Sequence, residues 1–424
     1  MLTAIVGINW GDEGKGRMVD LLSSDYDVIC RYQGGNNAGH TVINEKGKFI
    51  LNLLPSGILR ETCVNVMGNG MVIDLEHLYK EIKTLADQGI KITPENLKIS
   101  DRAVICFPFH KMQDILEEER LREKRFGSTR RGIAPVYSDK YMKKALRMND
   151  LLSFDTLKDK LRDIIEWKNL TISGGYRSEE IVLEDMLNWV NEYGSKFVPF
   201  ITDTSKYLLS AIEDNKNIMF EAQLGALRDI EFGIYPYTTS SHTLAAYAPI
   251  GAGIPSKKLD YVIGIMKAYS TCVGEGPFTA ELFGEEASKL REAGAEYGAA
   301  TGRPRRVGGF DVPASRFGVQ LQGSHCLALT KLDVLGYLDR IPVCVAYEID
   351  GERTTEFPVG DRLVRAKPVY EYLEGFKADI SKCRKKEELP KAALDYIKFI
   401  EESVGCPIKY VSVGPRREDY IVME

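Results

Sequence analysis

A glycine-rich loop directly after an apolar run is the feature that most constrains the fold of this chain. Residues 9–16 read Asn-Trp-Gly-Asp-Glu-Gly-Lys-Gly; they follow the apolar segment Leu2–Ile8 and precede a helix-like stretch, Met18–Leu22. Strand, glycine-rich turn and helix in this order predict a phosphate-binding loop. In such a loop the backbone N–H groups and the positive end of the helix dipole hold anionic oxygens, and Lys15 adds a positive charge.

The loop departs from the common G-x-x-x-x-G-K-[ST] pattern. Asn9 replaces the first glycine, and Gly16 replaces the Ser or Thr that usually binds Mg²⁺. The loop also contains Asp12 and Glu13, and a carboxylate beside phosphates is repelled unless it binds a metal or takes a proton during the reaction. These departures indicate chemistry beyond simple nucleotide hydrolysis.

A second segment close by completes a pattern that resembles a known family. The two segments are Gly-Asp-Glu-Gly-Lys-Gly at 11–16 and Asn-Asn-Ala-Gly-His-Thr at 36–41. Together they are similar to the adenylosuccinate synthetases, which make adenylosuccinate from IMP and aspartate with GTP and Mg²⁺. The resemblance implies a ligase that forms a C–N bond through a 6-phosphoryl-IMP intermediate, in the first committed step of AMP synthesis. It also implies a homodimer whose sites borrow a residue from the partner.

Composition limits the other possibilities. A hydrophobic content of 44% supports a sizeable core, and a net charge of −5 argues against a nucleic-acid or anionic-membrane partner. We find neither a signal-peptide pattern nor a long apolar run in the sequence, and we therefore expect a cytoplasmic protein. The eight cysteines have no C-x-x-C spacing, which favours reduced thiols over a disulfide framework or a metal site.

Strand-like and helix-like segments alternate along the chain, and this predicts an α/β fold with a large, mostly parallel central sheet flanked by helices. Tyr261–Lys267 is nearly all apolar, as suits a strand buried on both faces. The predicted strands are Thr3–Asn9, Asp27–Tyr32, Phe49–Leu54, Cys63–Met67, Leu97–Ile99, Asn217–Phe220, Tyr261–Lys267, Cys326–Lys331, Pro342–Ile349 and Lys409–Val413. The predicted helices are Asp74–Gln88, Met112–Glu123, Glu180–Glu192, Thr204–Asp214, Ala287–Ala293 and Ala392–Val404. We expect one continuous, P-loop-NTPase-like domain over 1–424, with long functional loops.

The chemistry implied by the resemblance needs a base and a donor. The 6-oxo group of IMP is a poor leaving group, but removal of the N1 proton makes it anionic and able to attack the γ-phosphate of GTP. Asp12 is suited to be this base, and His40 to be a donor that stabilises the transferring phosphoryl group. The resemblance assigns the same roles to both. It also has Asp12 and the Gly39 carbonyl bind Mg²⁺, and adds Lys15 and Gln223 to the catalytic residues.

Guanine recognition is predicted near the end of a later strand. Thr330-Lys331-Leu332-Asp333 follows an apolar run, and an aspartate can accept hydrogen bonds from both N1–H and the 2-amino group of guanine. Lys331 can lie over the base, and residues 412–415 resemble a second guanine-contacting turn. The residues expected to bind GTP are Gly11, Asp12, Glu13, Gly14, Lys15, Gly16, Arg17, Gly39, His40, Thr41, Arg305, Lys331, Leu332, Asp333, Ser412, Val413 and Gly414.

Aspartate needs cationic partners for its two carboxylates. The segment 299–306, Ala-Ala-Thr-Gly-Arg-Pro-Arg-Arg, resembles the aspartate loop of the family. Arg303 can hold a carboxylate bidentately, while Arg305 can reach the nucleotide ribose or phosphate. The residues expected to bind aspartate are Ala299, Ala300, Thr301, Gly302, Arg303 and Arg305.

The expected IMP site draws on several loops. Thr129 lies in a segment, 127–135, that resembles the 5′-phosphate loop, and Thr239 lies in the matching segment 235–241. Lys143 stands where the family has an arginine that reaches IMP in the neighbouring subunit; lysine keeps the charge but loses the planar fork. The residues expected to bind IMP are Asp12, Asn37, Ala38, Gly39, His40, Thr129, Lys143, Gln223, Thr239 and Arg303.

One departure from the family bears on the purine. The family reads Phe-Glu-Gly-Ala-Gln-Gly, whereas residues 220–225 read Phe-Glu-Ala-Gln-Leu-Gly, so the glutamine has moved by one position to Gln223. On a strand this slip would turn the side chain to the opposite face, whereas in a loop Gln223 can still reach the base.

Three alternatives remain open on sequence grounds. A relative acting on another purine monophosphate is disfavoured by the retained Asp12. A GTP-binding regulatory protein that hydrolyses nucleotide without joining substrates has no need of Thr301-Gly302-Arg303. A catalytically decayed relative kept for binding is compatible with the shifted Gln223, but Asp12, Lys15 and His40 together argue against it.

Overall fold

The fold is built around one central sheet. The computed structural model describes residues 1–44, 47–298, 302 and 304–423, and in these residues ten strands form the sheet. Every neighbouring pair is parallel except the edge pair β19–β20. In order across the sheet the strands are β20 (Tyr420–Val422), β19 (Ile408–Ser412), β15 (Cys326–Thr330), β11 (Tyr261–Lys267), β1 (Leu2–Gly7), β10 (Ile218–Glu221), β2 (Val28–Arg31), β5 (Val64–Met67), β7 (Leu97–Ser100) and β9 (Ile201–Thr202). The predicted α/β fold with a mostly parallel sheet is confirmed.

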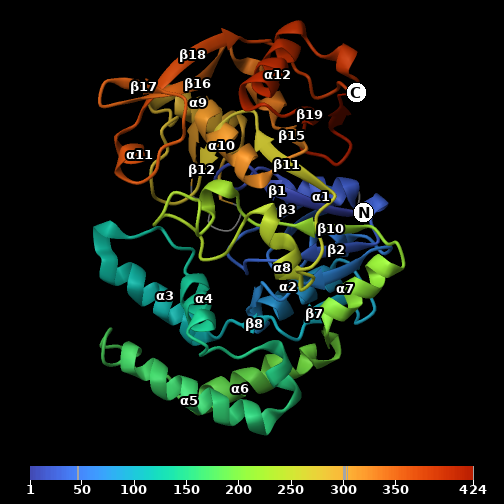
Figure 1. Cartoon of the computed structure of the whole chain (residues 1–424), viewed down its shortest axis with the longest axis vertical. Coiled ribbons are helices and arrows are strands. Elements are labelled where there is room, and N and C mark those ends of the chain that lie inside the picture. The colour runs from blue at the N-terminus through green and yellow to red at the C-terminus, as the bar shows by residue number, and fades with distance from the viewer. Residues whose placement is uncertain (45–46, 299–301, 303, 424) are drawn as a thin grey trace.

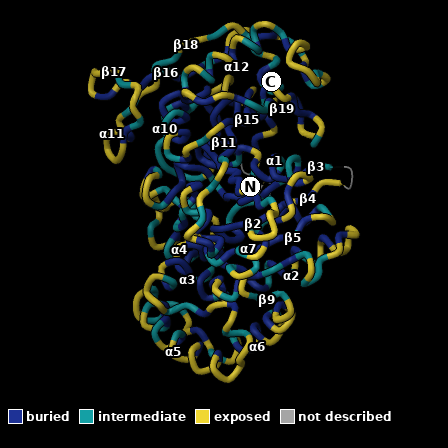
Figure 2. The backbone as a smooth tube through the Cα atoms, turned by 45° about the vertical axis from the view of Figure 1, so that its right-hand side comes forward, coloured by how far each residue is buried: buried dark blue, intermediate teal, exposed yellow. Residues whose placement is uncertain are grey.

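The strand β1 lies in the middle of this sheet and is buried along its whole length. Its residue Ala4 is paired with Phe220 of β10 on one side and Val262 of β11 on the other. Figure 2 shows the central strands as buried backbone, with the exposed chain around the outside of the molecule. A strand covered on both faces needs a continuous apolar run, which explains the composition of residues 2–8.

Smaller sheets accompany the central one. The hairpin β3 (His40–Asn44) and β4 (Gly47–Leu51) is antiparallel, and β6 (Val72–Ile73) pairs with β8 (Val104–Ile105). Near the C-terminal end, β14 (Phe310–Asp311), β16 (Arg340–Ile349), β17 (Glu352–Thr354) and β18 (Lys367–Glu374) form a second sheet, while β12 (Ser270–Cys272) pairs with β13 (Arg306–Gly308).

Two predicted strands therefore lie outside the central sheet. Phe49–Leu54 falls on β4, which ends at Leu51, and Pro342–Ile349 falls on β16 of the second sheet. The apolar residues after β4 leave the ladder because the Glu81 carboxylate accepts hydrogen bonds from the backbone N–H groups of residues 52, 53 and 54, at 3.0, 2.9 and 3.2 Å. An apolar run indicates a strand but not the neighbour with which it pairs.

The helices are arranged around the sheet, and several of them form a separate layer at one end of the molecule (Figure 1). Figure 1 shows α3 to α6 together at one end of the long axis, and α12 beside the second sheet at the other. Among the described residues, none of the helices combines the length and the apolar character that a membrane crossing needs. The helices are α1 (Lys15–Leu22), α2 (Leu75–Asp87), α3 (Pro108–Leu121), α4 (Ile133–Tyr141), α5 (Phe154–Ile172), α6 (Leu183–Tyr193), α7 (Thr204–Glu213), α8 (Ala248–Ala252), α9 (Gly284–Ala293), α10 (Val312–Gln322), α11 (Asp361–Arg365) and α12 (Lys391–Val404).

The six predicted helices are present with shifted ends, but two long helices were not predicted. The helix α5 buries Leu157, Leu161 and Ile165 on one face against the core cluster that also contains residues of α2, α3 and α6. The helix α10 has no continuous apolar stripe, yet seven of its eleven residues are buried. A helix covered on most sides has no clear amphipathic period, so its pattern is weak in the sequence.

Helix α10 supports the glycine-rich loop from behind. Asp311 caps the helix by accepting from the backbone N–H of Ala314 at 3.0 Å, and the Tyr347 hydroxyl donates to the same carboxylate at 2.7 Å. Further along the helix, the Ser315 hydroxyl accepts a hydrogen bond from the Asn9 side chain at 3.0 Å. By holding α10 in place, the Asp311 cap therefore helps to fix Asn9 at the start of the glycine-rich loop.

We expect Asp311→Ala to lower the free energy of unfolding by about 2–4 kcal/mol. The loss combines a helix cap worth about 1 kcal/mol with a buried Tyr347 hydroxyl left unsatisfied, which costs about 1–3 kcal/mol. Urea unfolding followed by circular dichroism measures it. Asp361→Ala, at the exposed start of α11, is the matched control and should change stability by about 0.5 kcal/mol or less. Equal effects of the two substitutions would contradict the role of the cap.

Candidate active site

Five adjacent strands of the central sheet, β15, β11, β1, β10 and β2, end at one edge. Because they are parallel, their carboxyl ends meet there, which is where open α/β sheets bind ligands. Lys331 and Asp333 follow β15, Asp12 follows β1, and Gln223 follows β10. His40 begins β3, after the turn that contains Asn37, Ala38 and Gly39. The predicted residues thus come from neighbouring positions along this edge.

The glycine-rich loop is held in shape from inside by Glu13. One carboxylate oxygen of Glu13 accepts from the backbone N–H groups of Asn9 at 3.1 Å and Gly11 at 2.7 Å. The other lies 2.6 Å from Nζ of Lys15, and both side chains are buried. The loop then turns into α1 through Gly14, whose φ of 99° is one that only glycine adopts easily. Glu13 therefore orients Lys15 at the start of the helix.

The structure explains why glycine occupies position 16. A Cβ atom on Gly16 would lie 2.5 Å from Cβ of His40 and 2.9 Å from its Cγ. The first turn of α1 is thus in direct contact with the start of β3, and Thr41 is the next residue of that strand, opposite Ile50. The Ser or Thr of the common loop pattern is excluded at this position because His40 fills the space.

His40 is held by a buried carboxylate. Its Nδ1 lies 2.5 Å from Oε1 of Glu221, and Glu221 also accepts from the backbone N–H and the hydroxyl of Ser56, at 2.7 and 2.6 Å. Burial lowers the pKa of His40, and the charge of Arg31 adds to this, although Glu221 opposes it. A neutral ring that donates from Nδ1 to Glu221 leaves Nε2 as the other nitrogen that can meet a ligand.

Asp12 lies at the tip of the loop with a φ of 60° and a side chain that is 28% exposed. Its carboxylate is 3.0 Å from the guanidinium of Arg305, and a second nitrogen of Arg305 is 2.7 Å from Glu296. The structure therefore brings the predicted base next to a predicted aspartate-binding arginine. The Glu296 carboxylate is fully buried behind them.

Gln223 lies in a loop, because β10 ends at Glu221 and Leu224 has a φ of 57°. The side chain is fully buried, and its amide nitrogen donates to the backbone carbonyls of Gly35 at 2.8 Å and Asn52 at 3.2 Å. Its Oε1 is among the buried side-chain atoms of the described residues that have no hydrogen-bond partner. Of the two possibilities left open by the sequence, the loop is the one observed.

Further residues predicted to bind IMP lie on four separate segments, and two of them, Thr129 and Thr239, are predicted to contact its phosphate. Thr129 is exposed on a loop that Asp114 holds by accepting from the Ser128 hydroxyl at 2.7 Å and from the Gly132 N–H at 2.9 Å. The Thr239 hydroxyl is buried without a partner in the described part of the chain. Asn37 and Ala38 form part of the turn before β3, where the Ala38 carbonyl accepts from the Asn52 amide at 2.9 Å. Lys143 is exposed just beyond α4.

The predicted guanine-side residues approach one another from three parts of the chain. Arg17 of α1 donates to the Ser412 hydroxyl at 2.9 Å and lies over the ring of Tyr420, 4.4 Å from its centroid. Asp333 lies in a short 3₁₀ helix, Leu332–Tyr337. Burial raises its pKa, although the charge of Arg17 opposes this effect. Val413 and Gly414 follow β19 directly, and the Gly414 carbonyl accepts from Ser412 at 3.1 Å.

The predicted aspartate loop is only partly described. Ala299, Ala300, Thr301 and Arg303 lie outside the described residues, while Gly302 has a φ of 65°. The base of the loop is closed by the backbone hydrogen bond from Arg305 N–H to the Glu296 carbonyl, 2.9 Å, and by pairing of Tyr297 with Pro304. The end of the loop, at Arg305, therefore lies next to Asp12.

Comparison with known proteins accounts for this arrangement. A family model described as adenylosuccinate synthetase matches residues 4–421. This chain belongs to the adenylosuccinate synthetase family. The match confirms the resemblance seen in the sequence, and with it a ligase that forms a C–N bond by joining aspartate to IMP at the expense of GTP in AMP synthesis.

Individual relatives agree over the whole chain. The adenylosuccinate synthetase of Caldanaerobacter subterraneus subsp. tengcongensis is 44% identical over 423 residues, covering 100% of this chain and 99% of the relative. That of Lactococcus lactis subsp. lactis is 44% identical over 422 residues, covering 99% and 98%. The solved structure of the fully ligated adenylosuccinate synthetase from Plasmodium falciparum has a TM-score of 0.93 at 38% identity, covering 100% and 99%.

Three residues that the sequence analysis missed shape the adenylosuccinate synthetase site in this chain. Glu221 holds His40, and Glu296 holds Arg305. Arg31 is fully buried behind them and donates to the carbonyls of Asn52 and Leu54 at 2.7 and 3.1 Å. A signal existed for two of them, since Arg31 and Glu221 each end an otherwise apolar strand, where a buried charge needs a partner.

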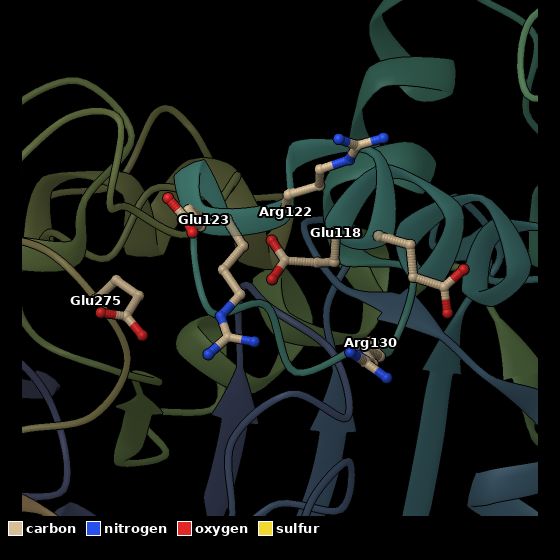
Figure 3. A pocket seen from close by; sticks show the side chains of 7 residues that line it. Glu118, Arg122, Glu123, Arg130 and Glu275 are labelled. Carbon is tan, nitrogen blue, oxygen red and sulfur yellow. The ribbon is translucent and has the colours of Figure 1, made fainter.

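A solvent-open hollow lies beside the predicted 5′-phosphate loop. Figure 3 shows Arg130 and Glu275 on opposite sides of it, with Glu118 of α3 between them. Glu118 accepts from the backbone N–H groups of Phe126 and Gly127, both at 3.1 Å. The hollow is lined by acidic and basic side chains together: Glu118, Glu119, Arg122, Glu123, Arg125, Arg130 and Glu275. Its wall of α3 thus holds the start of the loop that carries Thr129.

Proposed function

We propose that the chain joins L-aspartate to IMP with GTP through Asp12 as the base and His40 as the phosphoryl-stabilising group. The observation that carries this assignment is the contact between Asp12 and Arg305 at 3.0 Å, on the tip of the loop that also presents Lys15. The contact supports the proposal because a carboxylate suited to proton transfer, on the same loop as Lys15, lies beside a cation suited to aspartate.

The proposed reaction has two steps. Asp12 takes the N1 proton of IMP, the 6-oxygen attacks the γ-phosphorus of GTP, and the bond from that phosphorus to the β–γ bridging oxygen breaks to release GDP. The amino group of aspartate then attacks C6 and loses a proton, and the bond from C6 to the former 6-oxygen breaks to release the phosphate, which takes up that proton. Adenylosuccinate, GDP and phosphate are the products.

His40 and Lys15 act on the transferring phosphoryl group. The negative charge of the nucleotide raises the tendency of His40 to hold a second proton, and Glu221 at 2.5 Å from Nδ1 is placed to stabilise the resulting imidazolium. Nε2 then donates to a phosphoryl oxygen, while Lys15 supplies a positive charge at the start of α1. Gln223 is assigned to a contact with the purine 6-position, where its amide nitrogen is the group that can donate to the 6-oxygen.

The partly exposed carboxylate of Asp12 is the kind of donor that Mg²⁺ takes. Among the described residues no three His, Cys, Asp or Glu side chains form a metal-binding group. Magnesium needs less than this, since it commonly takes one or two carboxylates together with substrate phosphates and water. Asp12, with its partly exposed carboxylate, and the Gly39 carbonyl would hold it. When bound, the ion would neutralise charge on the phosphoryl oxygens.

The remaining substrate contacts follow the same assignment. Thr129 and Thr239 bind the 5′-phosphate of IMP, and Asn37 and Ala38 belong to the same IMP site; the buried Thr239 hydroxyl, which has no partner among the described residues, supports its role. Residues 299–303 and Arg305 bind aspartate.

We also infer a homodimer in which Lys143 reaches the IMP site of the partner. Its neighbours Tyr141 and Met142 support this, because they are large apolar side chains with exposed fractions of 65% and 49%. Sedimentation velocity with and without IMP measures the assembly.

Asp333→Asn tests the guanine assignment. We expect the KM for GTP to rise about tenfold or more, because the amide cannot accept from both N1–H and the 2-amino group as a carboxylate does. The change should be read from initial rates, with the KM for IMP as the internal reference. Asp339→Asn, an exposed aspartate paired only with Lys377 among the described residues, is the control. An unaltered preference for GTP over ATP would refute the assignment.

The function is tested by measuring GDP and adenylosuccinate with purified protein, IMP, GTP, aspartate and Mg²⁺, leaving out each component in turn. We expect product only when all are present. GTP hydrolysis that needs neither IMP nor aspartate would support a nucleotide-hydrolysing relative instead. Binding of GTP without any turnover on IMP would call for the same assay with other purine monophosphates.

A further inference from the structure

One buried carboxylate, that of Glu296, is shared by four side chains. Its Oε1 accepts from Nζ of Lys267 at 2.9 Å, from the Tyr269 hydroxyl at 2.6 Å and from Nζ of Lys331 at 2.9 Å. Its Oε2 accepts from Arg305 at 2.7 Å. Glu296 is completely buried, and Lys267 and Tyr269 nearly so.

The partners of Glu296 come from separate parts of the site. Lys267 is the last residue of β11, Lys331 follows β15, and Arg305 lies at the end of the proposed aspartate loop. Lys331 also donates to the carbonyl of Gly294, just before Glu296, at 2.5 Å. One side chain therefore joins the proposed guanine-binding lysine to the proposed aspartate-binding arginine.

Glu296 is surrounded by three cationic side chains, which favour its ionised form. Burial alone would raise the pKa of Glu296, but Lys267, Lys331 and Arg305 together hold it well below its usual range. Burial lowers the pKa of Lys267 to about 8 even though Glu296 opposes that effect. Three cationic side chains compete for two carboxylate oxygens, so a change in one contact alters the strength of the others.

We propose that Glu296 is a positioning residue that couples the binding of guanine nucleotide to the binding of aspartate. The proposal rests on the assignments of Lys331 and Arg305 given above. When a carboxylate of aspartate accepts hydrogen bonds from Arg305, the contact between Arg305 and Glu296 weakens. Glu296 then forms stronger hydrogen bonds with Lys331 and Lys267. Lys331 is then fixed over the guanine, and each ligand increases the affinity for the other, since binding coupling is reciprocal.

The experiment is calorimetric titration of a non-hydrolysable GTP analogue into the whole protein with Mg²⁺ and saturating IMP, with and without L-aspartate. We expect aspartate to lower the Kd of the wild-type protein about fivefold or more, within the usual range of coupling between sites. Glu296→Gln should reduce this factor to less than twofold. The KM values for GTP and aspartate should rise together in this variant, while that for IMP stays within about twofold.

Two further variants separate coupling from a general structural effect. Glu296→Asp keeps the charge but is shorter, so it cannot reach Arg305 and Lys331 at once, and its coupling factor should also fall at least threefold. It decides the matter if Glu296→Gln does not fold. Glu281→Gln removes the partner of Arg306, one residue beyond Arg305, and should leave the coupling unchanged.

Each result has a definite meaning. Wild-type coupling that is unaltered in folded Glu296→Gln or Glu296→Asp would overturn the inference. Binding of both ligands to the wild-type protein without mutual effect would overturn it as well, and would leave the proposed function intact. Failure to bind GTP or aspartate at all would instead contradict the assignments on which it rests.

Discussion

Asp12→Asn is expected to abolish turnover while GTP still binds. Asparagine has the size of aspartate and can still accept a hydrogen bond from Arg305, but it cannot take the N1 proton of IMP. Removal of a general base typically costs about 10²–10⁴-fold in rate, and here the loss of a proposed Mg²⁺ oxygen ligand adds to it. The expected residual kcat is therefore below about 1% of the wild-type value.

The measurement is kcat from chromatographic quantification of GDP and adenylosuccinate, together with the Kd for GTP by calorimetry. Asp25→Asn, the same chemical change at an exposed turn after α1, is the matched control and should keep full activity. A normal kcat for Asp12→Asn would refute the assignment of the base. A loss of GTP binding in proportion to the loss of kcat would show that Asp12 serves binding alone.

His40→Asn is expected to lower kcat by about 10²–10³-fold, the usual cost of removing one donor that stabilises charge in a transition state. The asparagine amide can still donate to Glu221, so the buried carboxylate keeps a partner. Asparagine has no atom equivalent to Nε2 of His40, so it cannot donate to the phosphoryl group there, and it cannot carry a positive charge. We expect the KM values for GTP and IMP to change much less than kcat.

A second readout for His40 is the pH dependence of stability. Because burial lowers the pKa of His40 in the folded state, the unfolded chain binds the extra proton first, and stability falls as the pH drops below about 6.5. His40→Asn should lose this part of the dependence. His325→Asn is the control for activity, because His325 stacks on Tyr261 at the opposite, amino end of β11 and should be dispensable for turnover.

The sequence predicted the parts of the site that are formed by residues close together along the chain. The loop around Asp12 and Lys15 was recognisable because strand, glycines and helix follow one another within a short segment. Glu221 and Glu296 were not found, since their partners are distant in the chain: Glu221 and His40 are 181 positions apart, and Glu296 and Lys331 are 35 apart. Long-range pairs of this kind are set by sheet order, which no local pattern contains.

The same reason explains the differences in the fold. Apolar runs identified β4 and β16 as strands, but their partners in the hairpin and the second sheet follow from packing of the whole chain. The position of Gln223 depended on where β10 ends. The register argument applies only while the chain remains a strand, and β10 ends two residues earlier.

The contact between Gly16 and His40 has an evolutionary consequence. A serine at position 16, which would restore the magnesium-binding hydroxyl of ordinary nucleotide hydrolases, would place its Cβ only 2.5 Å from that of His40. No single substitution at this position leads from one kind of loop to the other, because the histidine must move first. Positions 16 and 40 therefore constrain each other, and a lineage with His40 beside this helix can regain the hydroxyl only after a change that moves the histidine.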